Sequence, residues 1–406
     1  MSVVLPFAAL RPDPRRAAEI AAVPYDVVTT EEARQLAAGN PVSFLHVSRP
    51  EIDLPEGTDP HSDAVYAKAV ENLARLEREG PLVREPEPAL YLYRLRMGEH
   101  EQTGIAGAFS VDEYDTDRIR KHERTRRDKE DDRTRHMVAL RAQTGPVFLT
   151  FRGLLELDSI VAEERRRKPL YDFTAEDGVA HTVWKLGADE SRRLSEAFDA
   201  VPLLYVADGH HRAASASRAR DEFAMRADRA GGGAAYDFFL AVAFPSDQVR
   251  ILPYNRTVRG LGGRTPERFL DELRSSVPVS EGASPSPARR GEASIYLDRR
   301  WYGIRLAPDG SASDALDVTL LQERVLEPIL GIRDVRTDER IEFVGGARGT
   351  DALERKVDSG EAAVAFSVYP VSVDDLMRIA DAREIMPPKS TWFEPKLRDG
   401  LLSHVI

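Results

Sequence analysis

Cysteine is absent from the 406 residues of this chain. This absence excludes disulfide bonds, thiol catalysis and metal sites built from thiolates. The sequence also lacks an apolar run long enough to span a bilayer, and its first ten residues lack the basic segment of a signal peptide. We therefore expect a cytoplasmic protein that has no membrane partner.

An excess of positive charge is missing as well, because the formal net charge is -11. Proteins that bind nucleic acid by neutralising phosphates usually show a basic excess or a basic face. The basic run at residues 165–168 directly follows Glu163 and Glu164, which favours a solvated helix face. Nucleic acid is therefore not an expected partner.

Several familiar nucleotide-binding and catalytic motifs do not occur. The sequence contains no G-x-x-x-x-G-K-S/T phosphate loop and no G-x-G-x-x-G that opens a helix. It contains no G-x-S-x-G elbow. It also has no H-E-x-x-H, because Arg126 stands where the second histidine would follow His122 and Glu123. These absences disfavour P-loop, Rossmann and protein-kinase folds.

The chain does contain helical and strand patterns that mix without strict alternation. Helices are predicted at 63–79 and, after the N-cap residue Ser372, at 373–382; strands at 44–47, 89–97, 102–110 and 236–244; and loops at 231–233 and 279–291. Such a mixture is typical of an α+β fold with mixed sheets and helices.

The most informative stretch follows the apolar run at residues 203–207. Residues 208–212 read Asp-Gly-His-His-Arg, and small residues of helical character come next. This order predicts a buried strand, a tight turn and the start of a helix. Gly209 lets the backbone approach closely, and the first amides of the helix are unpaired donors at its positive end.

The side chains of this turn suit anion chemistry. Arg212 offers a planar fork for phosphate, and Asp208 is a candidate helix cap, base or metal ligand. His210 and His211 are expected to titrate near neutral pH. The alternative is a capped strand–helix junction with surface histidines.

A second constellation is the highly charged segment at residues 121–130. It is either a solvated helix face or a lid over a phosphate site. As a lid, it holds oxyanions with basic side chains, while an acidic one acts as general base or binds a divalent ion. The candidates are Lys121, Arg124, Arg126 and Lys129 among the basic residues and Glu123, Asp128 and Glu130 among the acidic ones.

Two proline turns complete the set of candidates. In residues 24–26 a rigid Pro-Tyr-Asp turn presents Tyr25 and Asp26 to a substrate, or simply enters a helix. Residues 387–393 join Lys389 to Ser, Thr and two aromatic residues. This second turn either docks onto the active site or anchors the C-terminal part of the chain.

Several of these stretches together resemble the DUF1015 family of bacterial and archaeal proteins. The matching stretches, which cover nearly the whole chain, are 24–27, 40–41, 44–47, 121–123, 128–130, 144–147, 207–212 and 386–391. This resemblance alone implies no activity.

A narrower resemblance implies an activity. Residues 208–214 are similar to the strand–turn–helix signature of the ParB/sulfiredoxin superfamily, whose members bind nucleotide phosphates there. Sulfiredoxin chemistry needs a cysteine in the motif, and ParB proteins normally carry a basic surface, so the branch that fits is that of the free serine kinases. The resemblance implies a ParB/sulfiredoxin-like nucleotide-binding core at 1–260. A smaller C-terminal α+β region at 261–406 is expected to pack back on it.

The implied activity is that of a kinase. A phosphoryl group from ATP or ADP, with Mg²⁺, goes to free serine or a similar hydroxyl metabolite. Glu123 is the first candidate for the general base, with Asp26 and Glu130 behind it. We assign catalysis to Asp208, His210, His211 and Glu123, nucleotide binding to Gly209, Arg212, Lys121 and Lys129, and substrate binding to Tyr25, Asp26 and Lys389. Two alternatives stay open: a nucleotide-binding regulatory module without acceptor-dependent turnover, and a phosphate-ester hydrolase.

Overall fold

The computed structural model describes residues 3–227, 233–306 and 315–406, which divide into two compact units. Unit 1 comprises Met1–Val249 and Pro395–Ile406, and unit 2 comprises Arg250–Glu394. The first boundary between the units thus follows Val249, before the boundary expected after residue 260. The segment Pro395–Ile406 belongs to unit 1 again. Residues 231–232 of the expected glycine loop lie outside the described residues.

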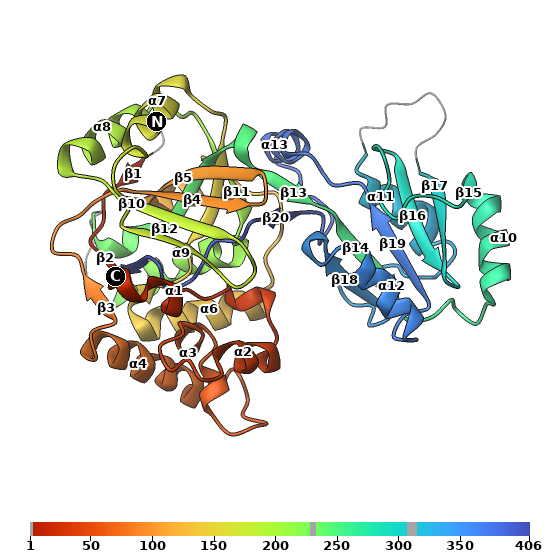
Figure 1. The fold of residues 1–406 in the computed structure, drawn as a ribbon, viewed down its shortest axis with the longest axis horizontal. Coiled ribbons are helices and arrows are strands. Elements are labelled where there is room, and N and C mark those ends of the chain that lie inside the picture. The colour runs from red at the N-terminus through yellow and green to blue at the C-terminus, as the bar shows by residue number, and fades with distance from the viewer. Residues whose placement is uncertain (1–2, 228–232, 307–314) are drawn as a thin grey trace. The chain divides into compact units, whose positions relative to one another are not determined.

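A nine-stranded mixed sheet forms the frame of unit 1 (Figure 1). Its strand order is β6-β11-β8-β12-β5-β4-β10-β9, with β1 beside β5. The pairs β6–β11 and β8–β12 are parallel, and the other pairs are antiparallel. The strands are β1 (Val4–Leu5), β4 (Tyr91–Met97), β5 (His100–Ser110), β6 (Ile119–Arg120), β8 (Val147–Phe151), β9 (Tyr171–Thr174), β10 (Ala180–Lys185), β11 (Leu204–Asp208) and β12 (Phe238–Pro245).

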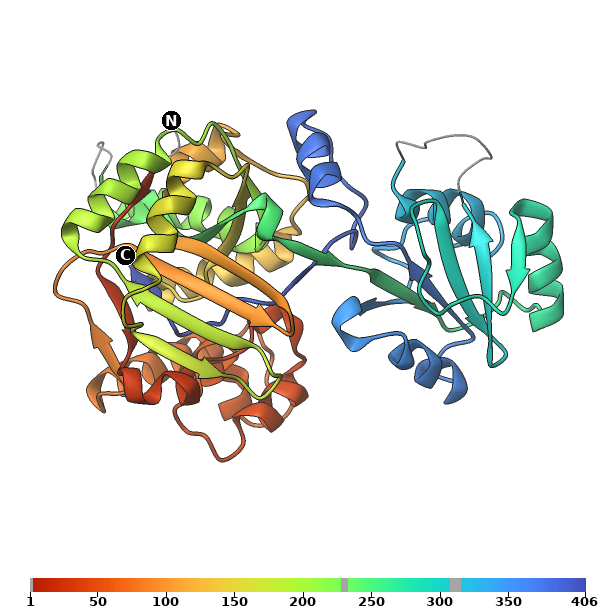
Figure 2. The same ribbon diagram turned by 45° about the horizontal axis from the view of Figure 1, so that its top comes forward.

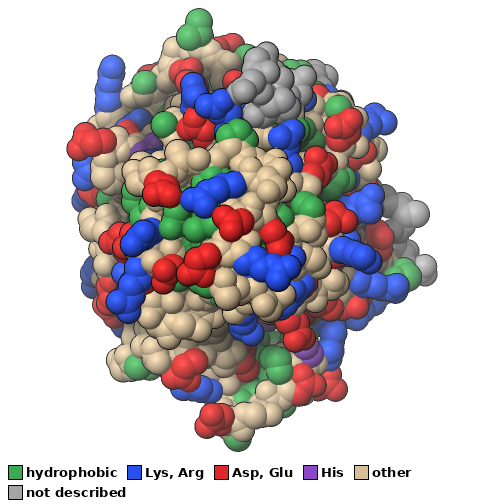
Figure 3. Space-filling model, turned by 90° about the vertical axis from the view of Figure 1, so that its right-hand side faces the viewer, with side chains coloured by type: hydrophobic (Ala, Val, Ile, Leu, Met, Phe, Trp, Pro, Cys, Tyr) green, Lys and Arg blue, Asp and Glu red, His purple; other side chains and the backbone are tan. Residues whose placement is uncertain are grey.

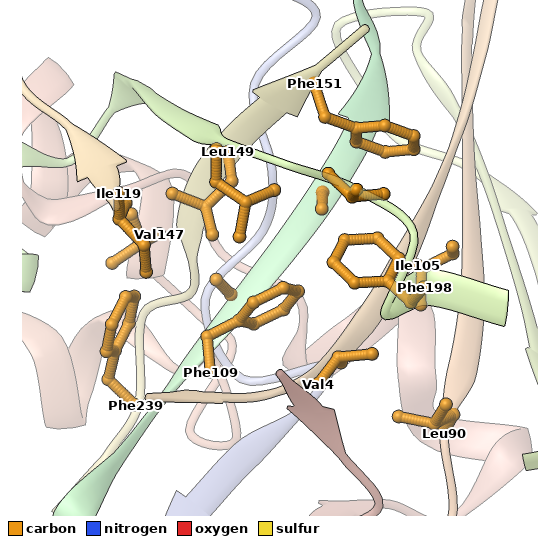
Figure 4. Close-up of a cluster of buried hydrophobic side chains, with 14 of the residues drawn as sticks. Val4, Leu90, Ile105, Phe109, Ile119, Val147, Leu149, Phe151, Phe198 and Phe239 are labelled. Carbon is orange, nitrogen blue, oxygen red and sulfur yellow. The ribbon is translucent and has the colours of Figure 1, made fainter. Parts of the chain in front are cut away.

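A large apolar cluster joins this sheet to its helices (Figure 4). The ring of Phe198 lies edge-on to those of Phe109 and Phe151, with centroids 5.9 and 5.3 Å apart. Such edge-to-face packing is a favoured arrangement of aromatic rings. On α9 the small residues Ala213 and Ala216 enter the same cluster, so this helix packs closely against the sheet. Helices that contribute to the cluster include α7 (Leu155–Glu164), α8 (Ala188–Phe198) and α9 (His210–Ala227).

A second sheet of unit 1 has the order β3-β2-β21-β7 and supports the helices of the N-terminal region. Helices α2, α3 and α4 lie together in both ribbon views (Figures 1 and 2), and their apolar faces share one core. The elements are β2 (Ala9–Pro12), β3 (Leu82–Arg84), β7 (Ala142–Gln143), β21 (Ser403–Val405), α1 (Ala17–Ile20), α2 (Thr30–Ala37), α3 (Leu45–Ser48), α4 (Asp63–Arg78), α5 (Val111–Asp115) and α6 (Arg127–Leu140).

Unit 2 contains a six-stranded sheet of order β15-β17-β16-β19-β14-β18 and a separate pair, β13–β20. On the face turned to the viewer in Figure 3, basic and acidic side chains are interspersed, and the described residues there form no continuous basic area. The elements are β13 (Arg250–Leu252), β14 (Tyr254–Val258), α10 (Pro266–Ser276), β15 (Val279–Glu281), β16 (Glu292–Leu297), β17 (Arg300–Arg305), α11 (Asp317–Leu321), β18 (Ile341–Gly345), α12 (Asp351–Asp358), β19 (Val364–Val368), α13 (Val373–Asp381) and β20 (Trp392–Glu394).

The structure confirms the α+β class and most of the predicted elements. Helices α4 and α13, the β4–β5 hairpin and strand β12 lie where the patterns placed them, and Ser372 caps α13 by accepting the N–H of Asp375 at 3.0 Å. The strand predicted at 44–47 is wrong, because this segment forms helix α3. Part of the loop predicted at 279–291 is strand β15. Among the described residues, no helix combines the length and apolar character needed to cross a bilayer.

Candidate functional site

The turn between β11 and α9 has the predicted strand–turn–helix form. Strand β11 ends at Asp208 and α9 begins at His210. Between them Gly209 has a φ of +91°, and a Cβ atom there would lie 2.9 Å from Nε of Arg212. Both the left-handed backbone and the close guanidinium therefore require glycine. The positive end of the 18-residue helix α9 begins at this turn.

Parallel pairing of β6 with β11 brings the charged segment at residues 121–130 next to the turn at residues 208–212. Ile119 and Arg120 of β6 pair with Leu204 and Tyr205 of β11, so both strands end at the same edge of the sheet. The residues that follow β6 therefore lie beside those that follow β11. As a result, the ring of His122 meets the ring of His210 edge-on, with centroids 4.4 Å apart.

The charged segment also contacts the first turns of α9. The backbone N–H of Arg126 donates to Nε2 of His211 at 3.0 Å, and Ser215 donates from its hydroxyl to the Glu130 carbonyl at 3.2 Å. Arg218 pairs with the Glu130 carboxylate at 3.2 Å. The segment thus covers the start of α9, which is the placement that a lid requires.

The two lysines assigned from this segment lie differently. Lys121 pairs with Asp117 at 2.8 Å and lies over the ring of Tyr114 at 4.3 Å. Lys129 is exposed on the first turn of α6. Lys121 therefore already has local partners, whereas Lys129 faces solvent.

Burial changes the titration expected for the motif histidines. It lowers the pKa of His122 to about 4, and burial together with the neighbouring His122 lowers the pKa of His210 well below its usual range. An imidazolium ion in an apolar interior is poorly solvated. Both rings are neutral at pH 7, which corrects the expectation that His210 titrates near neutrality.

Arg212 is buried where three segments of unit 1 meet. Its Nη1 donates to the carbonyl of Pro146. Its Nη2 lies 3.6 Å from Asp208 Oδ2 and 3.9 Å from Asp26 Oδ2. Its Nε has no hydrogen-bond partner among the described residues. A buried donor without a partner costs free energy, and an anion at the site would satisfy it.

Asp208 is held in its charged form by two cations. Its Oδ2 accepts from Nζ of Lys396 at 3.1 Å. Burial raises the pKa of Asp208, but Lys396 and Arg212 outweigh it and hold that pKa well below its usual range. At neutral pH the site therefore contains an ionised carboxylate with a lysine on one side and an arginine on the other.

The Pro-Tyr-Asp turn lies against the same arginine. The ring of Tyr25 is buried beneath the guanidinium of Arg133, at 4.1 Å. Next to it the Asp26 carboxylate is exposed and faces Arg212. Tyr25 and Arg212 both line a cavity of about 30 Å³, which has room for about one water molecule.

Asp399 also lines this cavity, although no sequence pattern pointed to it. Its Oδ1 is buried without a hydrogen-bond partner among the described residues. Burial raises the pKa of Asp399 to about 7, with a smaller increase from Asp26 and an opposing effect of Arg212. A backbone bridge to Ala22 fixes its position, with N–O distances of 2.9 and 3.1 Å.

Lys396 and Asp399 were therefore not among the predicted site residues. Both lie in the last segment of the chain, far in sequence from residues 208–212. The one signal that could have found them is the presence of charged residues among the leucines of this segment, where Arg398 and Asp399 are buried.

Lys389 belongs to unit 2. Its ammonium group lies 5.4 Å from the centre of the Tyr254 ring, and its carbonyl accepts from Nη2 of Arg256 at 3.1 Å. Unit 2 also contains a cavity of about 360 Å³ that residues between Pro278 and Arg305 line. Only Glu292 and Arg305 are charged among its lining residues.

Comparison with known sequences identifies a family for most of the chain. The family described as "Protein of unknown function (DUF1015)" matches residues 4–322. No curated protein matches the sequence.

Solved structures show only a distant likeness. A C-terminally truncated SbnI from Staphylococcus aureus is 12% identical, with a TM-score of 0.39 over 72% of this chain and 85% of that one. A free serine kinase variant in complex with AMP is 12% identical, with a TM-score of 0.37 over 73% and 92%. A conserved hypothetical protein from Pyrococcus furiosus is 13% identical, with a TM-score of 0.37 over 74% and 94%.

Proposed function

This chain belongs to the DUF1015 family, and we propose that it is a phosphotransferase of small metabolites. In this proposal ATP or ADP, with Mg²⁺, supplies the phosphoryl group, and the hydroxyl group of free serine or a similar compound accepts it. Unit 1 holds the site around the turn at residues 208–212.

One observation carries the proposal: segments far apart in the sequence meet at the start of α9. Asp26 faces Arg212 at 3.9 Å, the Arg126 amide donates to His211 at 3.0 Å, and Lys396 reaches Asp208 at 3.1 Å. A turn that served only to join a strand to a helix would not need charged side chains from two other segments and a backbone contact from a third.

The start of α9 provides the groups that phosphates need. The first amides of the helix and its dipole favour an anion, and Gly209 leaves the backbone accessible. Arg212 contributes a buried Nε without a partner among the described residues, and His211 lies at the same end of the helix. Phosphoryl transfer depends mainly on positioning and on neutralising charge, and these groups are of that kind.

Three carboxylates take the remaining roles. Asp208, which is ionised at neutral pH, suits the binding of Mg²⁺ or the orientation of the acceptor hydroxyl, because a carboxylate of low pKa is a weak base. Glu123 and the exposed Asp26 are the candidates for the general base. Glu130 stays behind them, because Arg218 and Thr125 hold its carboxylate. The assignment of Tyr25 to the acceptor stays a prediction, and the predicted role of Lys389, which belongs to unit 2, is not part of this site.

The experiment is a nucleotide-consumption assay with Mg²⁺ and a panel of free amino acids and small alcohols. We compare wild type with Arg212→Lys, which keeps the charge but loses the fork. The control is Arg226→Lys, an exposed arginine on the same helix. We expect acceptor-dependent turnover that falls about 100-fold in Arg212→Lys and is unchanged in the control.

Two other outcomes separate the alternatives. Nucleotide binding without acceptor-dependent turnover would indicate the regulatory module. The absence of nucleotide binding by folded wild-type protein would overturn the phosphate site.

A further inference from the structure

We propose that His122, Glu123 and His210 form a binding site for a divalent transition-metal ion of the Zn²⁺ type. One ligand atom from each of the three side chains lies within 4.8 Å of the other two. Two imidazoles and one carboxylate are a ligand set that proteins use for zinc and for iron. The binding of this ion does not depend on the phosphotransferase activity proposed above.

The backbone explains why these three residues meet. His122 and Glu123 follow β6, and His210 follows β11, with which β6 pairs in parallel. The chain lacks the H-E-x-x-H pattern, in which one helix carries both histidines. Here the two histidines come from different segments: His122 follows β6, and His210 begins helix α9.

Buried ring nitrogens with unmet hydrogen-bonding capacity point to a ligand. Nε2 of His210 has no hydrogen-bond partner among the described residues; the ring of His122 interacts with the backbone of Val206, but neither of its nitrogens makes a well-aligned hydrogen bond there. Both side chains are almost fully buried. Buried polar atoms without partners are rare and costly. The other buried histidines differ, since Nε2 of His136 and of His404 each bonds a backbone carbonyl, at 2.8 and 2.9 Å.

The size of the cluster fits a metal ion if the side chains draw together on binding. Zinc–nitrogen bonds are about 2.1 Å long and zinc sites are tetrahedral, so two ligand atoms on the same ion are about 3.4 Å apart. The three ligand atoms lie within 4.8 Å of one another, so the widest pair has to close by up to about an ångström and a half, a movement that the Glu123 side chain, which is only half-buried, can supply. The two rings already contact each other edge-on at 4.4 Å.

Negative charge for the ion comes mainly from Glu123, which is itself a ligand. The Asp208 carboxylate also acts electrostatically on both histidine rings, but Lys396 and Arg212 pair with it and offset most of its charge.

The chemistry of the donors selects the kind of metal. Neutral imidazole nitrogens suit Zn²⁺ and its neighbours in the first transition row, whereas Mg²⁺ prefers oxygen ligands in octahedral geometry. This ion is therefore distinct from the Mg²⁺ that accompanies a nucleotide. If Glu123 binds the ion, Asp26 becomes the first candidate for the general base.

The test is a Co²⁺ titration of the full chain after removal of bound metal with a chelator, followed by visible absorption and checked by elemental analysis with Zn²⁺. We expect one equivalent of Co²⁺ per chain and a higher melting temperature. In His122→Gln, His210→Gln and Glu123→Gln we expect affinity to fall at least 100-fold. His404→Gln, which removes a buried histidine elsewhere in unit 1, should bind like wild type.

Several results would overturn the site: no stoichiometric Co²⁺ or Zn²⁺ in folded wild-type protein, full affinity in Glu123→Gln, or displacement of Co²⁺ by an equal concentration of Mg²⁺. The Glu123 variant keeps the test decisive if the histidine variants do not fold, because its side chain is half-buried. Metal binding without acceptor-dependent turnover would support the metal site and contradict the proposed phosphotransferase activity. Acceptor-dependent turnover in a chain that binds no transition metal would support the activity and contradict the metal site.

Discussion

Gly209 is the residue on which the geometry of the turn depends most. In Gly209→Ala the new Cβ meets Arg212 Nε at 2.9 Å, and the φ of +91° is strained for alanine. We expect unit 1 to lose about 2 kcal/mol of its free energy of unfolding or more, measured by chemical denaturation.

The matched control is Gly178→Ala. Gly178 has a φ of +79°, but a Cβ atom added there would have no other atom within 4 Å, so only the backbone cost of about 1 kcal/mol should appear. An equal loss of free energy of unfolding in the two variants would show that the contact between the new Cβ atom and Arg212 does not destabilise the fold.

Asp399 makes the stability of unit 1 depend on pH. Because its pKa is raised to about 7, between about pH 4 and pH 7 the folded state keeps a proton that the unfolded state has lost. This group's contribution to stability is therefore greatest in acid and is lost as pH rises to 7. In Asp399→Asn the side chain is neutral throughout, so the melting temperature of the variant minus that of wild type should increase from pH 5 to pH 8. A difference that does not change with pH would contradict the raised pKa.

At the scale of single elements, local signals explain what could be predicted. The turn at residues 208–212 was predictable because an apolar run, a glycine and small helix-forming residues follow one another directly. The segment 44–47 was not, because four residues are too few to separate a strand from a buried helix. There the Asn40 side chain accepts from the N–H of Val42 at 3.2 Å, and its carbonyl accepts from Ser43 at 3.1 Å, so a turn precedes helix α3.

Contacts between distant elements were beyond local patterns. Lys396 and Asp208 lie 188 residues apart, and no periodicity links them. The pairing of β6 with β11 is equally non-local, although it determines that His122 meets His210. Residue types thus identified the turn and the charged segment as candidates, while only the sheet topology shows that they lie side by side.

Strand β21 gives a test at the scale of one element. It lies between β2 and β7, with His404 opposite both Ala9 and Gln143. Deleting residues 403–406 removes these pairings, at about 1 kcal/mol for each backbone hydrogen bond. We expect faster hydrogen exchange in β2 and β7, with the amides of unit 2 as the internal control. Unchanged exchange in β2 would show that β21 does not hold this sheet together.

At the scale of the whole molecule, unit 2 interrupts unit 1 in the sequence. It begins and ends on the antiparallel pair β13–β20, in which Arg250 lies opposite Glu394, so its two ends are close together. Replacing residues 250–394 with a short Gly-Ser linker should therefore leave unit 1 folded, with cooperative unfolding and the contact between Lys396 and Asp208 intact. A chain that unfolds without cooperativity would show that unit 1 needs unit 2.

The most direct test of the proposed site is hydrogen–deuterium exchange of the full chain with and without ADP and Mg²⁺. Binding at the start of α9 should slow exchange together in residues 24–28, 121–130 and 208–216, because these segments meet there. Protection confined to residues 278–305 of unit 2, around its larger cavity, would contradict this account. So would the absence of protection anywhere at saturating nucleotide.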